Sequence, residues 1–316
     1  MRRVALIYNP ASGQHTNGYA GAIESAVSVL RQAGVEAEMM PTHGPGAAGG
    51  LAREAVAKGC DTVVACGGDG TVHEVLQTLV GSEIALGVVP MGTANALAAD
   101  LGISAPPSRA VRTLLTATPV RISVGRIFFH DRDGVEHWRY FTVAAGVGAD
   151  GQFFYRLDSK LKRRFGYAAY FVEAMRLWSR HTFPLFEVDV TLPGSATSRS
   201  EPVSQLLAVR IGNFGGLVQN LVPGAALRNH HLRLVVFKTR SRMRYLSFMA
   251  AVIFRRHTFS SEIESMKAVS VECRGHSGFS ERLLVEADGE LLGCLPARIE
   301  LVPDALTLLI PATNQQ

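Results

Sequence analysis

Cysteines and long apolar runs are scarce in this sequence. Its four cysteines are Cys60, Cys66, Cys273 and Cys294. They form no CxxC pair, which argues against a disulfide framework or a zinc site and favours buried free thiols. The apolar run at 245–254 is much shorter than the ~20 residues that a membrane-spanning helix needs, and the N-terminus lacks the pattern of a signal peptide. We therefore expect a cytoplasmic protein without a transmembrane helix.

Acidic residues are missing from one long stretch. Between 228 and 257 there are eight Lys or Arg residues and no Asp or Glu, in a chain of net charge +5. A second basic cluster, at 156–164, contains a single acid, Asp158. Both stretches favour contact with an anionic surface or substrate, although a solvated basic face is the plain alternative. No nucleic-acid-binding motif accompanies the charge, so no nucleic acid partner is expected.

The pattern of apolar residues predicts two domains. The chain has 316 residues, of which 47% are hydrophobic, enough for two separate cores. Up to residue 119, strand patterns alternate with helical ones, which is typical of a mainly parallel sheet covered by helices. From residue 120 the patterns are mainly β. We predict an α/β N-terminal domain over 1–119 and a β-rich C-terminal domain over 120–299.

The individual elements follow from the same patterns. Strands are predicted at 4–8, 35–40, 61–66, 84–89, 120–129, 138–145, 183–192, 205–211, 232–237, 269–273, 298–302 and 305–310. Helices are predicted at 19–32, 49–58, 71–80, 159–179 and 241–256, and a polar surface loop at 193–202. We expect the helix at 241–256 to bury Leu246, Phe248, Met249, Val252 and Ile253 against its own sheet.

Three glycine-containing turns each follow a predicted strand. They read NPASG at 9–13, GGDGT at 67–71 and GTAN at 92–95. Because the carboxyl ends of parallel strands meet at one sheet edge, we expect the three turns to lie together. Glycine lets backbone amides approach a phosphate, and Thr71 with Glu74 fits a capping box that would start the next helix there. The turns predict a nucleotide site, and tight strand-to-helix connections are the alternative. No P-loop or Rossmann motif is present.

Two acids stand out by their surroundings. Asp69 lies within the second glycine turn, where it could bind Mg²⁺, accept a hydrogen bond from a hydroxyl, act as a base or cap the helix. Asp288 precedes a glycine between two strand-like runs, which is the pattern of a β-hairpin turn. The residues alone leave these roles open.

In combination, the motifs resemble the diacylglycerol kinase catalytic-domain family of lipid kinases, which includes bacterial diacylglycerol kinases and sphingosine kinases. In the N-terminal half the matching segments are NPASG, GGDGTVHEVL at 67–76 and VVPMGTANALAADLGI at 88–103. In the C-terminal half they are AAGVGAD at 144–150, KRRFGYAAY at 162–170, GNFGG at 212–216 and EADGE at 286–290. The resemblance implies an ATP-binding α/β domain, a C-terminal β-sandwich and an active site in the cleft between them. It also implies that residues from about 300 to 316 return to the first domain.

The resemblance also implies roles for individual residues. The expected nucleotide-binding residues are Asn9, Pro10, Ser12, Gly13, Gly67, Gly68, Gly70, Thr71, Gly92, Thr93 and Asn95. Asp288 ranks first and Asp69 second as the base that accepts the proton of the lipid hydroxyl. Glu290 is expected near the metal or its hydrogen-bond network, so that Asp69 and Glu290 are the candidate Mg²⁺ ligands. The implied cofactors are thus ATP and Mg²⁺, and the implied reaction transfers the γ-phosphoryl group to a lipid hydroxyl.

The chain departs from the family's pattern at 228–233, where it reads RNHHLR. Bacterial members commonly have an acidic turn there, which in some relatives holds a structural Mg²⁺. Either this chain dispenses with that metal or its activity is impaired. A transition-metal site at His230 and His231 is less favoured than a solvated loop, because adjacent histidines lack a useful ligand spacing.

A lipid substrate implies a bilayer partner. Aromatic residues that would suit an anionic leaflet accompany the second basic cluster: Phe153, Phe154, Tyr155, Phe165 and Tyr167. Two alternatives remain: an NAD kinase, which shares the GGDG turn, and a non-catalytic lipid- or nucleotide-binding protein, suggested by the basic turn at 228–233. The oligomeric state is open, and a homodimer is compatible with the sequence.

Overall fold

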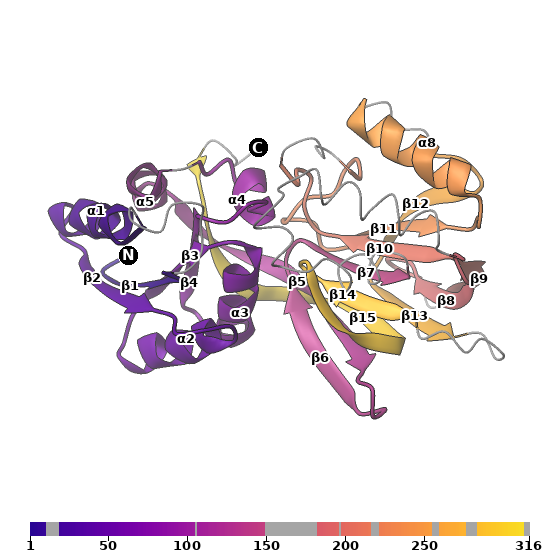
Figure 1. Cartoon of the computed structure of the whole chain (residues 1–316), viewed down its shortest axis with the longest axis horizontal. Coiled ribbons are helices and arrows are strands. Elements are labelled where there is room, and N and C mark those ends of the chain that lie inside the picture. The colour runs from indigo at the N-terminus through magenta and orange to yellow at the C-terminus, as the bar shows by residue number, and fades with distance from the viewer. Residues whose placement is uncertain are drawn as a thin grey trace. The chain divides into compact units, whose positions relative to one another are not determined.

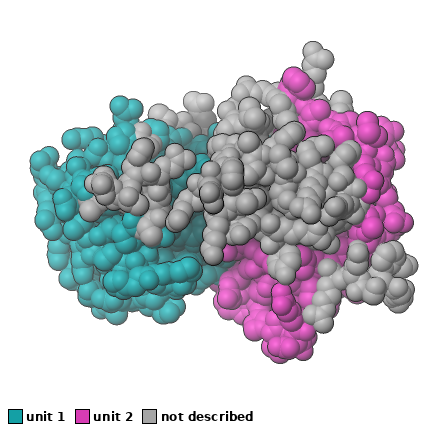
Figure 2. Space-filling model, in the orientation of Figure 1, with its two compact units in different colours: residues 1–124, 211–221, 302–316 teal, residues 125–210, 222–301 magenta. Residues whose placement is uncertain are grey.

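The computed structural model describes residues 1–10, 19–104, 106–148, 182–195, 197–215, 221–254, 259–275 and 283–312. The chain divides into two compact units (Figures 1 and 2). Unit 1 comprises 1–124, 211–221 and 302–316, and unit 2 comprises 125–210 and 222–301. The helix predicted at 159–179, the basic cluster at 156–164 and the five aromatic residues beside it lie outside the described residues.

Unit 1 is an α/β unit, as predicted. Its strands are β1 (Arg3–Tyr8), β2 (Glu36–Pro41), β3 (Thr62–Gly67) and β4 (Ala85–Pro90). They run parallel in the order β2-β1-β3-β4. Every residue of β3 and β4 is buried, because their near-continuous apolar sequences are covered by helices on both faces.

Four of the five described helices of unit 1 form two pairs. The five are α1 (Tyr19–Gln32), α2 (Ala47–Ala57), α3 (Asp69–Leu79), α4 (Ala96–Asp100) and α5 (Pro107–Leu115). α2 packs on α3 and α1 on α5, on opposite sides of the strands (Figure 1). The short α4 and α5 were not predicted. α5 begins with Pro107, whose fixed φ and missing N–H suit the first helical position.

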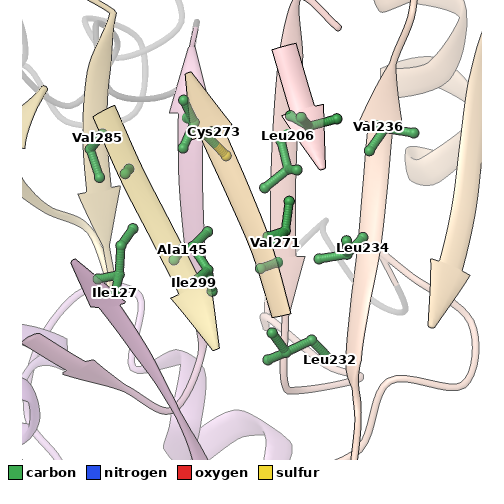
Figure 3. Close-up of a cluster of buried hydrophobic side chains, with 14 of the residues drawn as sticks. Ile127, Ala145, Leu206, Leu232, Leu234, Val236, Val271, Cys273, Val285 and Ile299 are labelled. Atoms are coloured by element: carbon green, nitrogen blue, oxygen red, sulfur yellow. The ribbon is translucent and has the colours of Figure 1, made fainter. Parts of the chain in front are cut away.

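Unit 2 is a β-sandwich. One layer contains β12 (Ile263–Ala268), β11 (Leu232–Phe237), β10 (Gln205–Val209), β7 (Ala144–Gly148) and β14 (Leu284–Ala287), paired in that order. The other contains β9 (Ser198–Val203), β8 (Phe186–Thr191) and β13 (Ser270–Gly275). The buried side chains of both layers form one core (Figure 3), to which Leu206, Leu234, Val271 and Cys273 belong.

Two long strands run through both units. β5 (Thr118–His130) pairs with β6 (Glu136–Phe141). β15 (Glu290–Ile310) pairs with β13 and β14 in unit 2, and its residues Thr307 and Leu308 pair with β4 in unit 1. The prediction of two strands at 298–302 and 305–310 was wrong, because Asp304, which interrupts the apolar pattern, is accommodated inside one strand with a φ of 45°.

Three further predictions in unit 2 were wrong. The strand expected at 138–145 is divided between β6 and β7, which are separated by residues 142–143. The expected loop at 193–202 contains β9, a polar strand that pairs antiparallel with β8. In α8 (Arg242–Ile253), Phe248 and Val252 are buried as predicted, but Met249 is exposed and Tyr245 is buried instead. Tyr245 stacks on Phe237 of β11 with a centroid distance of 4.6 Å, which sets the rotation of the helix. Leu246 is half-buried, and the side chain of Ile253 lies outside the described part.

Candidate functional site

The three glycine-containing turns follow neighbouring strands at one sheet edge. In the parallel register Tyr8 is paired with Cys66, and Gly67 with Pro90, so β1, β3 and β4 end close together. Asn9, which follows β1, is half-buried, and Pro10 is exposed. Ser12 and Gly13 lie outside the described residues. The prediction that the turns meet at one edge is thus confirmed for the described parts of all three.

The second and third turns are in direct backbone contact. A Cβ atom on Gly92 would collide with the Cα of Gly68, and one on Gly67 would collide with the side chain of Thr71. The N–H of Met91 donates to the carbonyl of Gly67 at 2.9 Å. Gly68 has an extended conformation, with φ −89°. These glycines are therefore required by close approach rather than by a left-handed backbone.

α3 starts earlier than predicted and without the capping box. Its first residue is Asp69, and its N-cap is Gly68, which makes no side-chain capping hydrogen bond. The carboxylate of Glu74 instead accepts the N–H groups of Gly46 at 2.7 Å and Ala48 at 2.9 Å, at the start of α2. The prediction failed because α2 packs beside α3 and offers Glu74 these amides. Thr71 is half-buried in the first turn of α3, with Gly70 beside it.

Asp69 links the second turn to the third. Its Oδ1 accepts the N–H of Ala96, the first residue of α4, at 2.7 Å. The carboxylate is half-buried, and an amide at the start of a helix offsets part of its charge. Asp69 therefore acts as a capping group for α4, in addition to being the first residue of α3.

Asn95 closes the third turn. Its backbone is left-handed, with φ 51°. Its Oδ1 accepts the N–H of Gly92 at 2.8 Å, and its Nδ2 donates to the Gly92 carbonyl at 2.9 Å. Gly92 and Thr93 are exposed. Asn95 thus fixes the shape of the turn, while Gly92 and Thr93 form its exposed part.

Asp100, which we did not predict, binds the segment that contains the GNFGG motif. Its Oδ1 accepts the N–H groups of Gly212 and Asn213, each at 2.9 Å. Burial raises the pKa of Asp100, and the two amides oppose this shift. Asn213 donates from Nδ2 to the carbonyl of Ala99 at 3.4 Å. The carboxylate thereby attaches residues 212–213 to α4 within unit 1.

In unit 2, Asp288 forms the predicted hairpin turn. Asp288 and Gly289 have φ values of 49° and 84°, and they connect β14 to β15. The side chain does more than occupy a turn, because it is only 8% exposed. Its oxygens accept the N–H groups of Thr142 at 3.0 Å, Val143 at 2.9 Å and Ala144 at 3.1 Å. Three amides therefore fix the carboxylate against the start of β7.

The other two acids of the EADGE motif differ in exposure. Glu290 is exposed, whereas Glu286 is only 4% exposed. Glu286 accepts the N–H of Gly289 at 3.2 Å across the turn. We named only Glu290, because Glu286 lies inside a strand-like run whose apolar neighbours gave no indication of a buried acid.

The main chain of Arg210, a residue with a buried cationic side chain, is hydrogen-bonded to a residue that also binds Asp288. The N–H of Arg210 donates to the carbonyl of Val143 at 2.9 Å, and Arg210 is only 1% exposed. Its guanidinium donates to the carbonyls of Leu227 at 2.7 Å, Asn229 at 3.0 Å and His231 at 2.8 Å. Burial lowers the pKa of Arg210 to about 10, so the side chain remains charged at neutral pH.

The turn at 228–233 therefore surrounds a cationic side chain. The pKa of His231 is lowered by burial and by the neighbouring cations Lys267, Arg233 and Arg210. The same charges would repel a metal ion. His230 is exposed, as expected for a solvated loop, whereas His231 is half-buried. Among the residues that the structure describes, no group of three or more His, Cys, Asp or Glu side chains could bind a metal.

The comparisons with known proteins agree with this architecture. Residues 3–127 match the model of the diacylglycerol kinase catalytic domain, and residues 142–310 match the YegS C-terminal NAD kinase beta sandwich-like domain. These matches define a two-domain protein of the kinase class. The chain belongs to the diacylglycerol kinase catalytic-domain family.

Individual relatives match along almost the whole length. The chain is 30% identical over 316 residues to a diacylglycerol kinase of Mycobacterium tuberculosis, covering 98% of this chain and 95% of the relative. It is 27% identical over 299 residues to a diacylglycerol kinase of Bacillus subtilis, covering 94% and 92%. A solved structure of a putative diacylglycerol kinase from Bacillus anthracis shares the fold, with TM-score 0.77 and 22% identity over 99% of this chain and 96% of the other.

The helices of the described residues do not meet the requirements for a membrane-spanning helix. None of them combines the length and hydrophobicity needed to cross a bilayer.

Proposed function

We propose that this chain is an ATP-dependent lipid kinase that phosphorylates the hydroxyl group of a lipid, with diacylglycerol as the first candidate acceptor. The observation that carries the proposal is the 30% identity, over 98% of the chain, to a protein named diacylglycerol kinase. The proposed reaction forms a bond between the acceptor oxygen and the γ-phosphorus and breaks the bond to ADP. A phosphorylated lipid product places the reaction in phospholipid metabolism.

The sheet edge of unit 1 is the proposed nucleotide site. The first amides of a helix have no acceptor within the helix, and the positive end of the helix dipole favours phosphate. α3 begins in this way directly after Gly68, which makes no side-chain capping hydrogen bond. The exposed part of the third turn, Gly92 and Thr93, is adjacent through the contact with Gly68. The first turn adds Asn9 and Pro10 to the proposed set, together with Ser12 and Gly13, which lie outside the described residues.

Magnesium is proposed to enter with ATP, as part of the substrate. Mg²⁺ bound to phosphates needs only one or two protein carboxylates. Asp69, half-buried at the start of α3, fits that role, and Glu290 is the second candidate because its side chain is exposed. The described residues include no group of three or more possible metal ligands. The two acids are therefore proposed to bind an ion that the nucleotide phosphates also bind.

Asp288 is the proposed base. A carboxylate that accepts a hydrogen bond from the attacking hydroxyl orients it and takes its proton as the new phosphorus–oxygen bond forms. The three amides on Asp288 hold its oxygens in one orientation, which suits a positioning task. In the rival interpretation, Asp288 has no role in proton transfer and only stabilises the backbone of residues 142–144 through these hydrogen bonds.

The test is phosphoryl transfer from γ-labelled ATP to a panel of diacylglycerol, monoacylglycerol, ceramide, sphingosine and NAD. We expect a labelled lipid product that depends on Mg²⁺. Labelled NADP without a labelled lipid would make the chain an NAD kinase. ATP binding without any labelled product, under conditions in which a known diacylglycerol kinase is active, would make it a binding protein and overturn the proposal.

The acceptor lipid resides in a bilayer, so we also propose that the protein binds peripherally to an anionic membrane surface. The exposed residues Arg228, Arg240 and Arg242 support this proposal, because anionic headgroups attract Lys and Arg clusters. Lys238 and Arg244 of the same stretch are paired with glutamates.

A further inference from the structure

α8 has an outward face to which the proposed reaction assigns no role. Its inward face is formed by Tyr245, Phe248 and Val252, all buried, and it lies beside β11 and β12 (Figure 1). On the outward face Met243 is 69% exposed, and Phe254, directly after the helix, is 74% exposed. Met249 is 44% exposed, but it lies about 120° around the helix from Met243, on a flank. Residues 243 and 254 are 11 apart, about three helical turns, so they lie on the same side. Two large apolar groups thus mark the two ends of one exposed helix face, with Ser247 and Ala250 between them.

Positive charge accompanies this apolar face. Arg242 begins the helix and Arg240 precedes it, and both are exposed. Arg244 forms an ion pair with Glu262, which offsets one charge. The helix itself contains no acid, and none occurs from 228 to 257. Arg240 and Arg242 also line a shallow pocket of about 360 Å³ at the start of the helix, together with Thr182, Phe183 and Met243.

The chemistry of this face fits one kind of partner. A helix with apolar groups on its outward side and arginines at one end matches an anionic bilayer, in which acyl chains receive the apolar groups and headgroup phosphates attract the arginines. We propose that the outward face of α8, defined as Arg240, Arg242, Met243 and Phe254, is the surface by which unit 2 rests on an anionic membrane. This proposal rests on the proposed function, because a kinase whose acceptor lipid lies in a bilayer has to bind the bilayer surface.

The two parts of the face predict different effects. Removing an arginine weakens attraction to anionic lipid by about fivefold per charge at low ionic strength. It leaves the weak binding to neutral lipid unchanged. Placing a carboxylate on the apolar part opposes insertion into any bilayer and repels anionic headgroups, so we expect a loss of about tenfold or more.

The test is co-sedimentation of the full chain with vesicles of phosphatidylcholine alone or mixed with phosphatidylglycerol, in the absence of ATP. The variants are Met243→Glu with Phe254→Glu, and Arg240→Gln with Arg242→Gln. Val135→Glu is the matched control, because Val135 is 53% exposed in the same unit but far from α8 in sequence. We expect the wild type and the control to bind the anionic vesicles and both double variants to lose binding, with unchanged thermal unfolding.

Several outcomes would overturn the inference. One is wild-type protein that does not sediment with anionic vesicles, and another is a Met243→Glu, Phe254→Glu variant that binds as well as the control. A wild-type dimer that this variant converts to a monomer would show instead that the face binds a second copy. Because vesicle binding is measured without turnover, a failed kinase assay leaves this result standing, and the reverse also holds.

Discussion

Asp69 in unit 1 and Asp288 in unit 2 are both followed by glycine, yet their backbones and surroundings differ. Asp69 is the first residue of a helix, half-buried, with one amide of α4 on its Oδ1. Asp288 has a left-handed backbone, is 8% exposed, and accepts three amides. The Asp-Gly dipeptide is the same in both places, so the sequence that flanks it decides which structure it adopts. A strand followed by a helical period places Asp69 in a helix, whereas two flanking strands place Asp288 in a hairpin.

The difference also separates the two proposed roles. An acid held by three amides and largely shielded from water has a fixed position, which suits contact with one reacting hydroxyl. An acid at the start of a helix, beside two glycine turns, suits contact with a bound phosphate and its magnesium ion. Substitutions at each position can test this division.

The largest effect is expected for Asp288→Asn. Asparagine retains one oxygen for the amides but cannot accept a proton, so we expect kcat to fall by about 10³-fold with nucleotide affinity unchanged. The measurements are steady-state transfer and calorimetric ATP binding. Asp131→Asn is the control, because the Oδ1 of Asp131 also accepts two backbone amides in unit 2, from Asp133 and Val135. Equal losses in both variants would reduce Asp288 to a structural role.

Asp69→Asn should affect nucleotide binding first. The variant keeps an oxygen for the N–H of Ala96 but loses the charge that would attract magnesium, so we expect affinity for magnesium ATP to fall by about tenfold. Titration with and without Mg²⁺ measures this directly. If Asp69→Asn leaves ATP affinity intact and abolishes transfer, the roles of the two acids must be exchanged.

Arg210→Met should destabilise unit 2 by about 3 kcal/mol, because three carbonyls lose a buried, charged donor. The change is followed by urea unfolding. Arg228→Met is the matched control in the same turn, since Arg228 is exposed and surface changes of this kind stay within about 0.5 kcal/mol. The N–H of residue 210 keeps its bond to the carbonyl of Val143 in this variant, so the loss of stability is expected to come from the side-chain contacts alone. Equal stability of the two variants would contradict the assignment.

Gly92→Ala should cost about 1–3 kcal/mol, since its Cβ would meet the Cα of Gly68. The matched change Gly21→Ala falls in α1, where nothing lies within 4 Å of the new Cβ, and should be neutral or stabilising by about 0.5 kcal/mol. Thermal unfolding compares the two. A tolerated Gly92→Ala would show that the two turns separate readily.

The smallest effect concerns His231 and pH. Its pKa is lowered in the folded chain from the ordinary 6.5, so the unfolded state binds the proton first as pH falls. Stability present above pH 6.5 should therefore decline as pH drops through the folded-state pKa. His231→Gln should flatten this decline in unfolding experiments between about pH 7.5 and 5.5. An unchanged slope would remove His231 as its source.

Regular periodic segments were predicted well from the sequence. The helix at 19–32 and the strand at 232–237 have the predicted bounds, because their apolar spacing and their burial in the fold agree. The hairpin at Asp288 followed from local turn chemistry. β9 was missed because its sequence is polar, and its pairing with β8 supplies the order that its composition does not.

The parts of the site that escaped prediction depend on partners distant in sequence. Glu74 reaches amides 26 and 28 residues away instead of closing its own helix. Asp100 binds amides more than 110 residues away. Nothing in the sequence around Arg210 indicates that its side chain binds the carbonyls of residues 227–231. A local pattern contains no information about such pairs.

The peptide groups that bind Asp288 and Arg210 have a consequence for how the sequence can change over time. Both charges are satisfied by main-chain atoms of residues 142–144, 227, 229 and 231, and every amino acid supplies a carbonyl. Those positions can therefore drift without removing a partner, except that proline is barred at 142–144 because it has no N–H to donate. Hydrogen bonding therefore requires only that one acid and one base be retained, whereas buried lining residues such as Thr142, Val143 and Leu227 are constrained by packing instead.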